Sequence, residues 1–218
     1  MKKIFPMLML LFIFAASAYA HTIDYELDRM EDGEVFGKYL QLGYTHILPL
    51  GFDHVLFILC VFFLNTNIKE IIKQATMFTL AHSITLGLAV YGYIQAPPSI
   101  IEPIIALSIV FLALENIFFE QVKPWRMIMV FLFGLVHGMG FAGALDDLGM
   151  PRYSFATALV SFNLGVELGQ LTVIAVMFFF VAKIFSKEVW YRSRIVIPAS
   201  IAIALVAAYW TVERIFFV

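Results

Sequence analysis

Six apolar stretches dominate the hydropathy pattern of this 218-residue chain, and polar segments separate them. Each has about 20 residues or more, the length an α-helix needs to cross a hydrocarbon core of about 30 Å. They lie at about 44–64, 74–94, 100–118, 127–145, 153–182 and 195–213. We therefore expect an all-α, polytopic membrane protein, a six-helix transmembrane bundle. The fifth stretch is long enough for a tilted or kinked helix.

The first 20 residues have the three parts of a secretory signal peptide. Lys2 and Lys3 form a basic start, an apolar run covers residues 4–16, and Ala18 and Ala20 form a small-x-small cleavage site. An uncleaved first helix is the alternative. With cleavage, the chain divides into a signal peptide at 1–20, a short acidic periplasmic segment at 21–43 and a six-helix transmembrane domain at 44–218.

Basic residues are concentrated in every second loop between the stretches. The residues are Lys69, Lys73, Lys123, Arg126, Lys183, Lys187, Arg192 and Arg194. Because positive charge is retained on the cytoplasmic side, we expect a multi-pass protein of a bacterial-type inner (plasma) membrane with both mature termini periplasmic. The chain is 62% hydrophobic and 14% charged, and it lacks a basic patch with interleaved aromatic residues, so no nucleic-acid partner is expected.

Ionisable side chains inside the apolar stretches are the candidate functional groups, because a charge at the bilayer centre costs at least about 2.5–3.5 kcal/mol. A rise of about 1.5 Å per residue places four of them near the midplane. These are His54, His82, His137 and Glu167. Asp53 lies at the level of His54, and the nearby Pro49 and Gly51 favour an irregular helix there. We expect His46 two turns above His54, as an entry-side position.

These groups form a nitrogen and oxygen ligand set, which suits Ni²⁺, Zn²⁺, Co²⁺ or Fe²⁺ better than Cu⁺. The candidate metal ligands are His46, Asp53, His54, His82, His137 and Glu167. A single intramembrane histidine often only hydrogen-bonds a neighbouring helix, so a structural role stays open for each. Asp53 or Asn116 could instead orient an imidazole, although Glu115 and Asn116 could equally cap a helix. The lone Cys60 excludes a cysteine-based zinc or iron–sulfur site.

Five segments between about Gly43 and Gln170 resemble the HupE/UreJ family of membrane proteins. The segments are HILPLGFDHVLF, FTLAHSITLGLA, IEPIIALSIVFLALEN, FGLVHGMGFAGAL and FNLGVELGQ. The family is associated with hydrogenase and urease maturation, and its members are regarded as nickel permeases. The resemblance implies that the family's histidine–Asp–His motif falls on His46, Asp53 and His54. It also implies Ni²⁺ as the ion and metalloenzyme maturation proteins as partners.

We therefore expect a divalent metal ion permease or a metal-handling accessory protein, whose partners are the lipid bilayer and the metal ion. No residue is assigned a catalytic role. An intramembrane metal-dependent hydrolase is the alternative, because a metal with an open coordination position lowers the pKa of a bound water to about 7. No nucleotide-binding motif occurs in the sequence, so a gradient or a partner would have to supply any energy.

Overall fold

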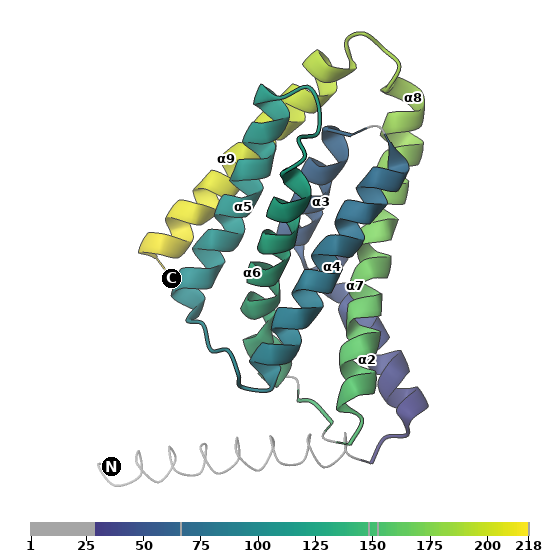
Figure 1. The fold of residues 1–218 in the computed structure, drawn as a ribbon, viewed down its shortest axis with the longest axis vertical. Coiled ribbons are helices and arrows are strands. Elements are labelled where there is room, and N and C mark those ends of the chain that lie inside the picture. Colours follow the sequence, from purple (N-terminus) through teal and green to yellow (C-terminus); the bar gives the residue numbers. More distant parts are fainter. Residues whose placement is uncertain (1–28, 66, 148, 152, 218) are drawn as a thin grey trace, which may run out of the picture.

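The computed structural model describes residues 29–65, 67–147, 149–151 and 153–217, and the predicted signal peptide lies outside them. All regular structure in these residues is helical, with no strand among them, which confirms the all-α prediction (Figure 1). The helices are α2 (Asp32–Ile47), α3 (Phe52–Phe63), α4 (Ile68–Val90), α5 (Pro98–Phe118), α6 (Arg126–Asp147), α7 (Phe155–Met177), η1 (Phe178–Ala182), α8 (Lys183–Phe185), η2 (Arg192–Val196) and α9 (Ile197–Phe216).

Several helices are long and apolar enough to cross a membrane. Within the described residues, four meet this requirement: Pro98–Phe118, Arg126–Gly143, Phe155–Phe185 and Arg192–Phe216. The pair α2 and α3 adds a fifth if it is counted as one span bent by 68°. The expected second span, α4, is less apolar, because Lys69, Glu70 and Lys73 lie in its first turns. The chain is thus a membrane protein, and the count of six spans stays a prediction.

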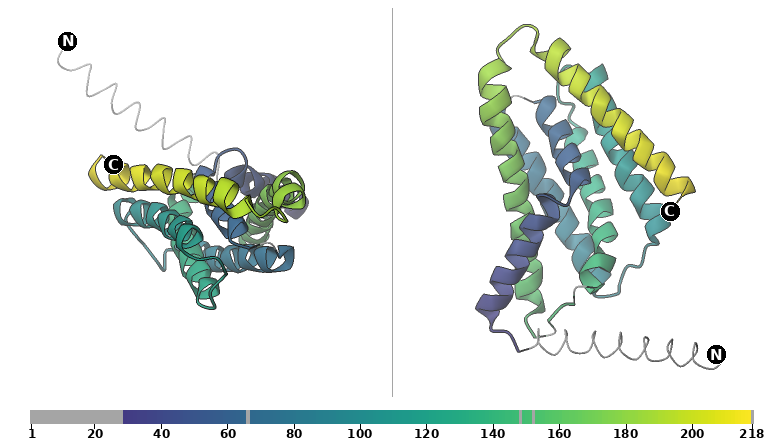
Figure 2. Two further views of the ribbon diagram at one scale, coloured as in Figure 1. Left: turned by 90° about the horizontal axis from the view of Figure 1, so that it is seen from above. Right: turned by 180° about the vertical axis from the view of Figure 1, so that it is seen from behind.

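The helices pack most extensively in three pairs, which are α2 with α7, α4 with α6, and α5 with α9. Figure 2 shows α2 against one half of α7, and α9 alongside α5. The α2–α7 pair is close enough for backbone contact, since a Cβ on Gly43 would overlap the carbonyl of Phe162 and a Cβ on Gly165 that of Leu40. Small residues permit such approach in membrane bundles. Residues on both sides of the expected boundary at 43/44 therefore belong to one packed helix.

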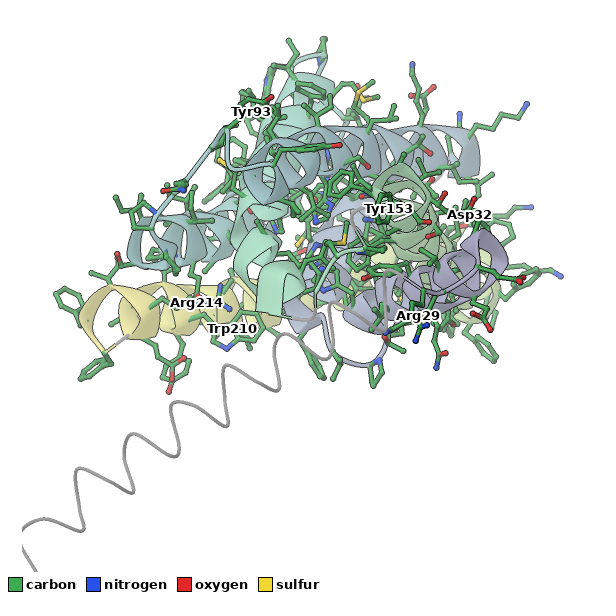
Figure 3. All side chains as sticks on the ribbon, turned by 90° about the horizontal axis from the view of Figure 1, so that it is seen from below. Arg29, Asp32, Tyr93, Tyr153, Trp210 and Arg214 are labelled. Atoms are coloured by element: carbon green, nitrogen blue, oxygen red, sulfur yellow. The ribbon has the colours of Figure 1, made fainter. Side chains whose placement is uncertain are left out.

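The two ends of the bundle differ in charge. One end, called the basic end below, has the loops at 64–65, 119–125 and 186–191 and the basic residues named above. The opposite end has the loop at 91–97 and the loop residues 149–151 and 153–154. Figure 3 views this opposite end, where Tyr93 and Tyr153 are largely exposed and Trp210 lies near Arg214 on α9. Such amphipathic rings are typical of the membrane–water interface.

Candidate metal centre

A break between α2 and α3 brings three histidines together. The two helix axes differ by 68° at this break. The ring centroid of His46, in the last turn of α2, lies 4.7 Å from that of His54, in the first turn of α3. The ring of His82, from the middle of α4, lies 5.8 Å from His54 and 6.1 Å from His46. One ligand atom from each of the three lies within 4.8 Å of the other two, so this histidine cluster could hold a metal ion.

The expected irregularity near Pro49 and Gly51 is confirmed, but the position expected for His46 is wrong. A continuous helix would have placed His46 two turns above His54. The chain instead turns at residues 48–51, and the two imidazoles come into edge-to-face contact. His46 is therefore part of the cluster rather than a separate station above it.

Hydrogen bonds on the Nδ1 atoms orient three imidazoles of the centre, those of His54, His82 and His137. Nδ1 of His54 lies 3.1 Å from Oδ1 of Asp53, and Nδ1 of His82 lies 3.2 Å from Oδ1 of Asn163. Nδ1 of His137, on α6, lies 2.8 Å from the carbonyl oxygen of Phe133. Each partner is an acceptor, so the neutral ring must donate from Nδ1. The lone pair is then on Nε2, the arrangement that metal-bound histidines usually have.

The Nε2 atoms of all four intramembrane histidines are buried and have no hydrogen-bond partner. Two nitrogen ligands of one tetrahedral ion at about 2.0–2.1 Å lie about 3.4 Å apart. The three rings of the cluster would therefore have to shift by about 1 Å to share an ion. His137 could supply a fourth ligand, because its ring centroid lies 5.1 Å from that of His54.

Phenylalanine rings cover the centre on two sides. Phe78 and Phe57 lie toward the basic end, with centroids 4.9 Å and 5.3 Å from His137. Phe141 and Phe162 lie toward the opposite end and stack on each other at 5.1 Å, and Phe141 is 3.9 Å from His46. These rings leave the Asp53 side, where 23% of the carboxylate side chain is exposed, as the more open edge.

Two of the predicted ligands, Asp53 and Glu167, are not among the three residues whose ligand atoms lie close together. Asp53 contacts His54 through both the imidazole and the backbone N–H, the latter at 2.9 Å, so it lies in an orienting position. Glu167 lies farther along α7, where its Oε1 accepts a hydrogen bond of 2.6 Å from Thr76. Asn163, which orients His82, was given no role in the sequence analysis, because the register between α4 and α7 decides that contact.

A second polar cluster lies near the basic end. The guanidinium of Arg126 is fully buried and contacts Glu115 at 2.6 Å, Gln74 at 3.1 Å and the carbonyl oxygen of Cys60 at 2.8 Å. Asn116 donates to the same carbonyl at 2.9 Å. The sequence analysis counted Arg126 as a loop charge and considered a capping role for Glu115. In the structure the two side chains instead form a buried ion pair. Asn116 orients no imidazole.

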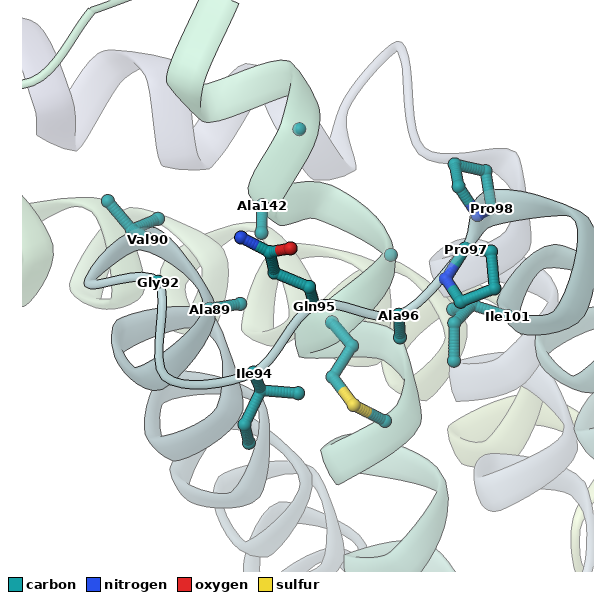
Figure 4. A pocket seen from close by; sticks show the side chains of 13 residues that line it. Ala89, Val90, Gly92, Ile94, Gln95, Ala96, Pro97, Pro98, Ile101 and Ala142 are labelled. Carbon is teal, nitrogen blue, oxygen red and sulfur yellow. The ribbon is translucent and has the colours of Figure 1, made fainter.

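A cavity of about 620 Å³ opens at the opposite end. Figure 4 shows it between the loop that carries Gln95 and the last turns of α6, where Ala142 lies. Its α6 lining includes Met139 and Gly140, but its lining residues include none of the clustered histidines. The cavity is therefore not the metal centre.

A sequence model of one family, described as HupE / UreJ protein, matches residues 22–214. The matched residues include every candidate metal ligand, the histidine cluster and the buried Arg126–Glu115 pair. No curated protein and no solved structure matches the chain.

Proposed function

The chain belongs to the HupE/UreJ family, and from this premise we propose that it is a permease for a divalent metal ion of the nickel type. One observation supports the proposal most directly. In His54, His82 and His137 the Nδ1 atom is hydrogen-bonded to an oxygen acceptor, and the Nε2 atom is buried without a partner. Because the ligand atoms of His46, His54 and His82 lie within 4.8 Å of one another, their imidazoles could share one ion after a small shift. Imidazole suits Ni²⁺, and also Zn²⁺, Co²⁺ and Fe²⁺.

In the proposed site, His46, His54 and His82 bind the ion and His137 completes the shell. Asp53 and Asn163 are positioning residues, because each holds an imidazole that binds. Asp53 also places a carboxylate at the more exposed edge of the cluster, where its negative charge attracts a cation. The Phe57 and Phe78 rings on one side and the Phe141 and Phe162 rings on the other would keep the bound ion from both aqueous phases.

We further propose that the chain lies in a bacterial-type inner membrane with six spans, a cleaved signal peptide at 1–20 and both mature termini periplasmic. α4 would be the second span, with its Lys69 and Lys73 on the cytoplasmic side. Discontinuous helices near the midplane are also how many transporters form their substrate sites.

The test combines metal binding with transport. The purified protein is titrated with Ni²⁺ by equilibrium dialysis and then reconstituted into vesicles that contain a metal-sensitive dye. We expect His54→Ala and His82→Ala each to weaken Ni²⁺ binding by about 100-fold, because each removes a nitrogen ligand and leaves the shell incomplete. The control His21→Ala removes the remaining histidine of the chain, and it should bind and transport as the parent does.

Two outcomes would contradict the proposal. If both histidine variants bind Ni²⁺ as the parent does and remain monodisperse, the cluster is structural. If the parent binds Ni²⁺ tightly but moves none into the vesicles, the protein handles metal as an accessory protein rather than as a permease.

A further inference from the structure

Two rows of polar side chains face each other along the contact between α4 and α7, from the histidine cluster toward the basic end. The row on α7 consists of Asn163, Glu167 and Gln170, and the row on α4 consists of Thr76, Thr79 and Ser83. Both rows have a spacing of three or four residues, which keeps each on one face of its helix. We call the two rows together the polar seam. Polar groups on membrane helices usually face other protein groups or a solute path.

Three hydrogen bonds cross the polar seam. Nearest the cluster, Asn163 contacts His82 at 3.2 Å. Farther along, Thr79 donates to Oε1 of Gln170 at 3.3 Å, and Thr76 donates to Oε1 of Glu167 at 2.6 Å. Thr76 precedes His82 by six residues, so the seam extends about 9 Å from the cluster along α4.

The polar seam also has unused hydrogen-bonding capacity. Gln170 is fully buried, and its Nε2 atom has no partner. Oε2 of Glu167 is likewise buried without a partner. A buried polar group without a partner costs about 1–3 kcal/mol, and Nε2 and Oε1 of the Gln170 amide exchange places on a flip of its side chain. Glu167 therefore has one free oxygen, and Gln170 has one after such a flip; the two residues lie three positions apart on α7, and each contacts a threonine hydroxyl.

The direct way from the cluster to the basic end is unfavourable for a cation. α3, α4 and α6, which carry His54, His82 and His137, converge there on the buried guanidinium of Arg126. The rings of Phe57 and Phe78 lie between this guanidinium and the histidines. These apolar rings offer a cation no oxygen or nitrogen ligand. The polar seam instead provides oxygen atoms, from Thr76 and Glu167 and from Thr79 and Gln170.

Building on the proposed permease function, we propose that the polar seam is the route between the histidine cluster and the basic end, and that Glu167, Gln170, Thr76 and Thr79 form a second cation site on it. Its ligands are all oxygen atoms, which hold a partly hydrated divalent cation less tightly than imidazole holds Ni²⁺. A weaker site next to the tight site would help the ion to leave the protein, because conduction requires that an ion can dissociate from each site it occupies. Glu167 thereby acts at this second site and not as a ligand in the cluster.

The first experiment is equilibrium dialysis of the full chain against Ni²⁺ over a wide concentration range. The parent should show one tight and one weaker site. Glu167→Gln keeps the side-chain shape but removes the charge, and it should lose only the weaker site. His54→Ala should lose only the tight one. The matched control is Glu213→Gln on α9, which also loses a carboxylate that accepts a hydroxyl hydrogen bond, and it should keep both.

The second experiment measures Ni²⁺ uptake by the same variants in vesicles. Glu167→Gln should lower the rate about tenfold or more while the affinity of the tight site stays within twofold of the parent value. The proposal is overturned if Glu167→Gln keeps both binding sites, or if it loses the tight site and so proves to be a ligand in the cluster. If the parent binds two ions but transports none, the permease function fails and the second site stands.

Discussion

The substitution Gly138→Ala tests whether close packing of α4 on α6 positions His82 for metal binding. Gly138 follows His137 on α6, and a Cβ built on it would overlap the carbonyl oxygen of His82 and Oγ1 of Thr85. It would also lie 3.0 Å from the carbonyl carbon of His82. Two of these three atoms belong to the α4 backbone, so a change of rotamer cannot relieve the overlap.

The size of the effect follows from these contacts. Ordinary contacts between non-bonded heavy atoms are about 3.5–4.0 Å long, so α4 must move away from α6 by about 1 Å at His82. Overpacking of this kind costs about 1–3 kcal/mol of stability. The same shift moves His82 relative to His46 and His54, although metal–ligand distances tolerate only about 0.2 Å. We expect Ni²⁺ affinity to fall about tenfold or more, and no further than in His82→Ala.

The assay is Ni²⁺ dialysis together with thermal unfolding in detergent. Gly143→Ala is the matched control, because Gly143 lies on the same helix and a Cβ there meets nothing within 4 Å. It should keep the parent affinity and midpoint. The reasoning is refuted if Gly138→Ala also binds Ni²⁺ with the parent affinity, since His82 would then not depend on the α4–α6 approach.

Two further predictions concern stability and topology. Arg126→Met and Glu115→Gln should each lower the free energy of unfolding by about 3–5 kcal/mol, because each leaves one charge of a buried pair uncompensated. Denaturant unfolding measures this change. Losses below about 1 kcal/mol for both variants would contradict a structural role for the pair. Reporter fusions at residues 70, 122 and 188 should report the cytoplasm and those at 97 and 149 the periplasm, and a cytoplasmic signal at either of the latter would overturn the proposed orientation.

Hydropathy and helix geometry were sufficient to predict the helical class and four of the six expected spans. They also predicted that His54, His82 and His137 share a depth, because a rise of about 1.5 Å per residue converts sequence position into depth. The size of the bend at the α2–α3 break could not be predicted in this way. Proline and glycine mark where a helix becomes irregular, but the packing of α2 on α7 determines the direction in which the chain continues.

The buried ion pair was missed for a different reason. A basic residue at the end of an apolar stretch reads as a loop charge, and Arg126 fits that description in sequence. The available signal was Glu115, an acidic residue within an apolar stretch, since a buried carboxylate requires a partner. Its partner is separated from it by a loop and comes from the next helix, so only the turn between α5 and α6 shows that the two side chains meet.

The break between α2 and α3 decides whether the histidine cluster exists. In a continuous helix, eight residues would separate His46 and His54 by about 12 Å along the axis, too far for one ion. The observed ring centroids lie 4.7 Å apart. At Gly51 a Cβ would overlap the carbonyl oxygen of His46 and lie 3.3 Å from Cα of Ile47. The first turn of α3 can therefore reach the last turn of α2 only because residue 51 has no side chain. The irregular segment that interrupts the apolar pattern is what joins two separate histidines into one site.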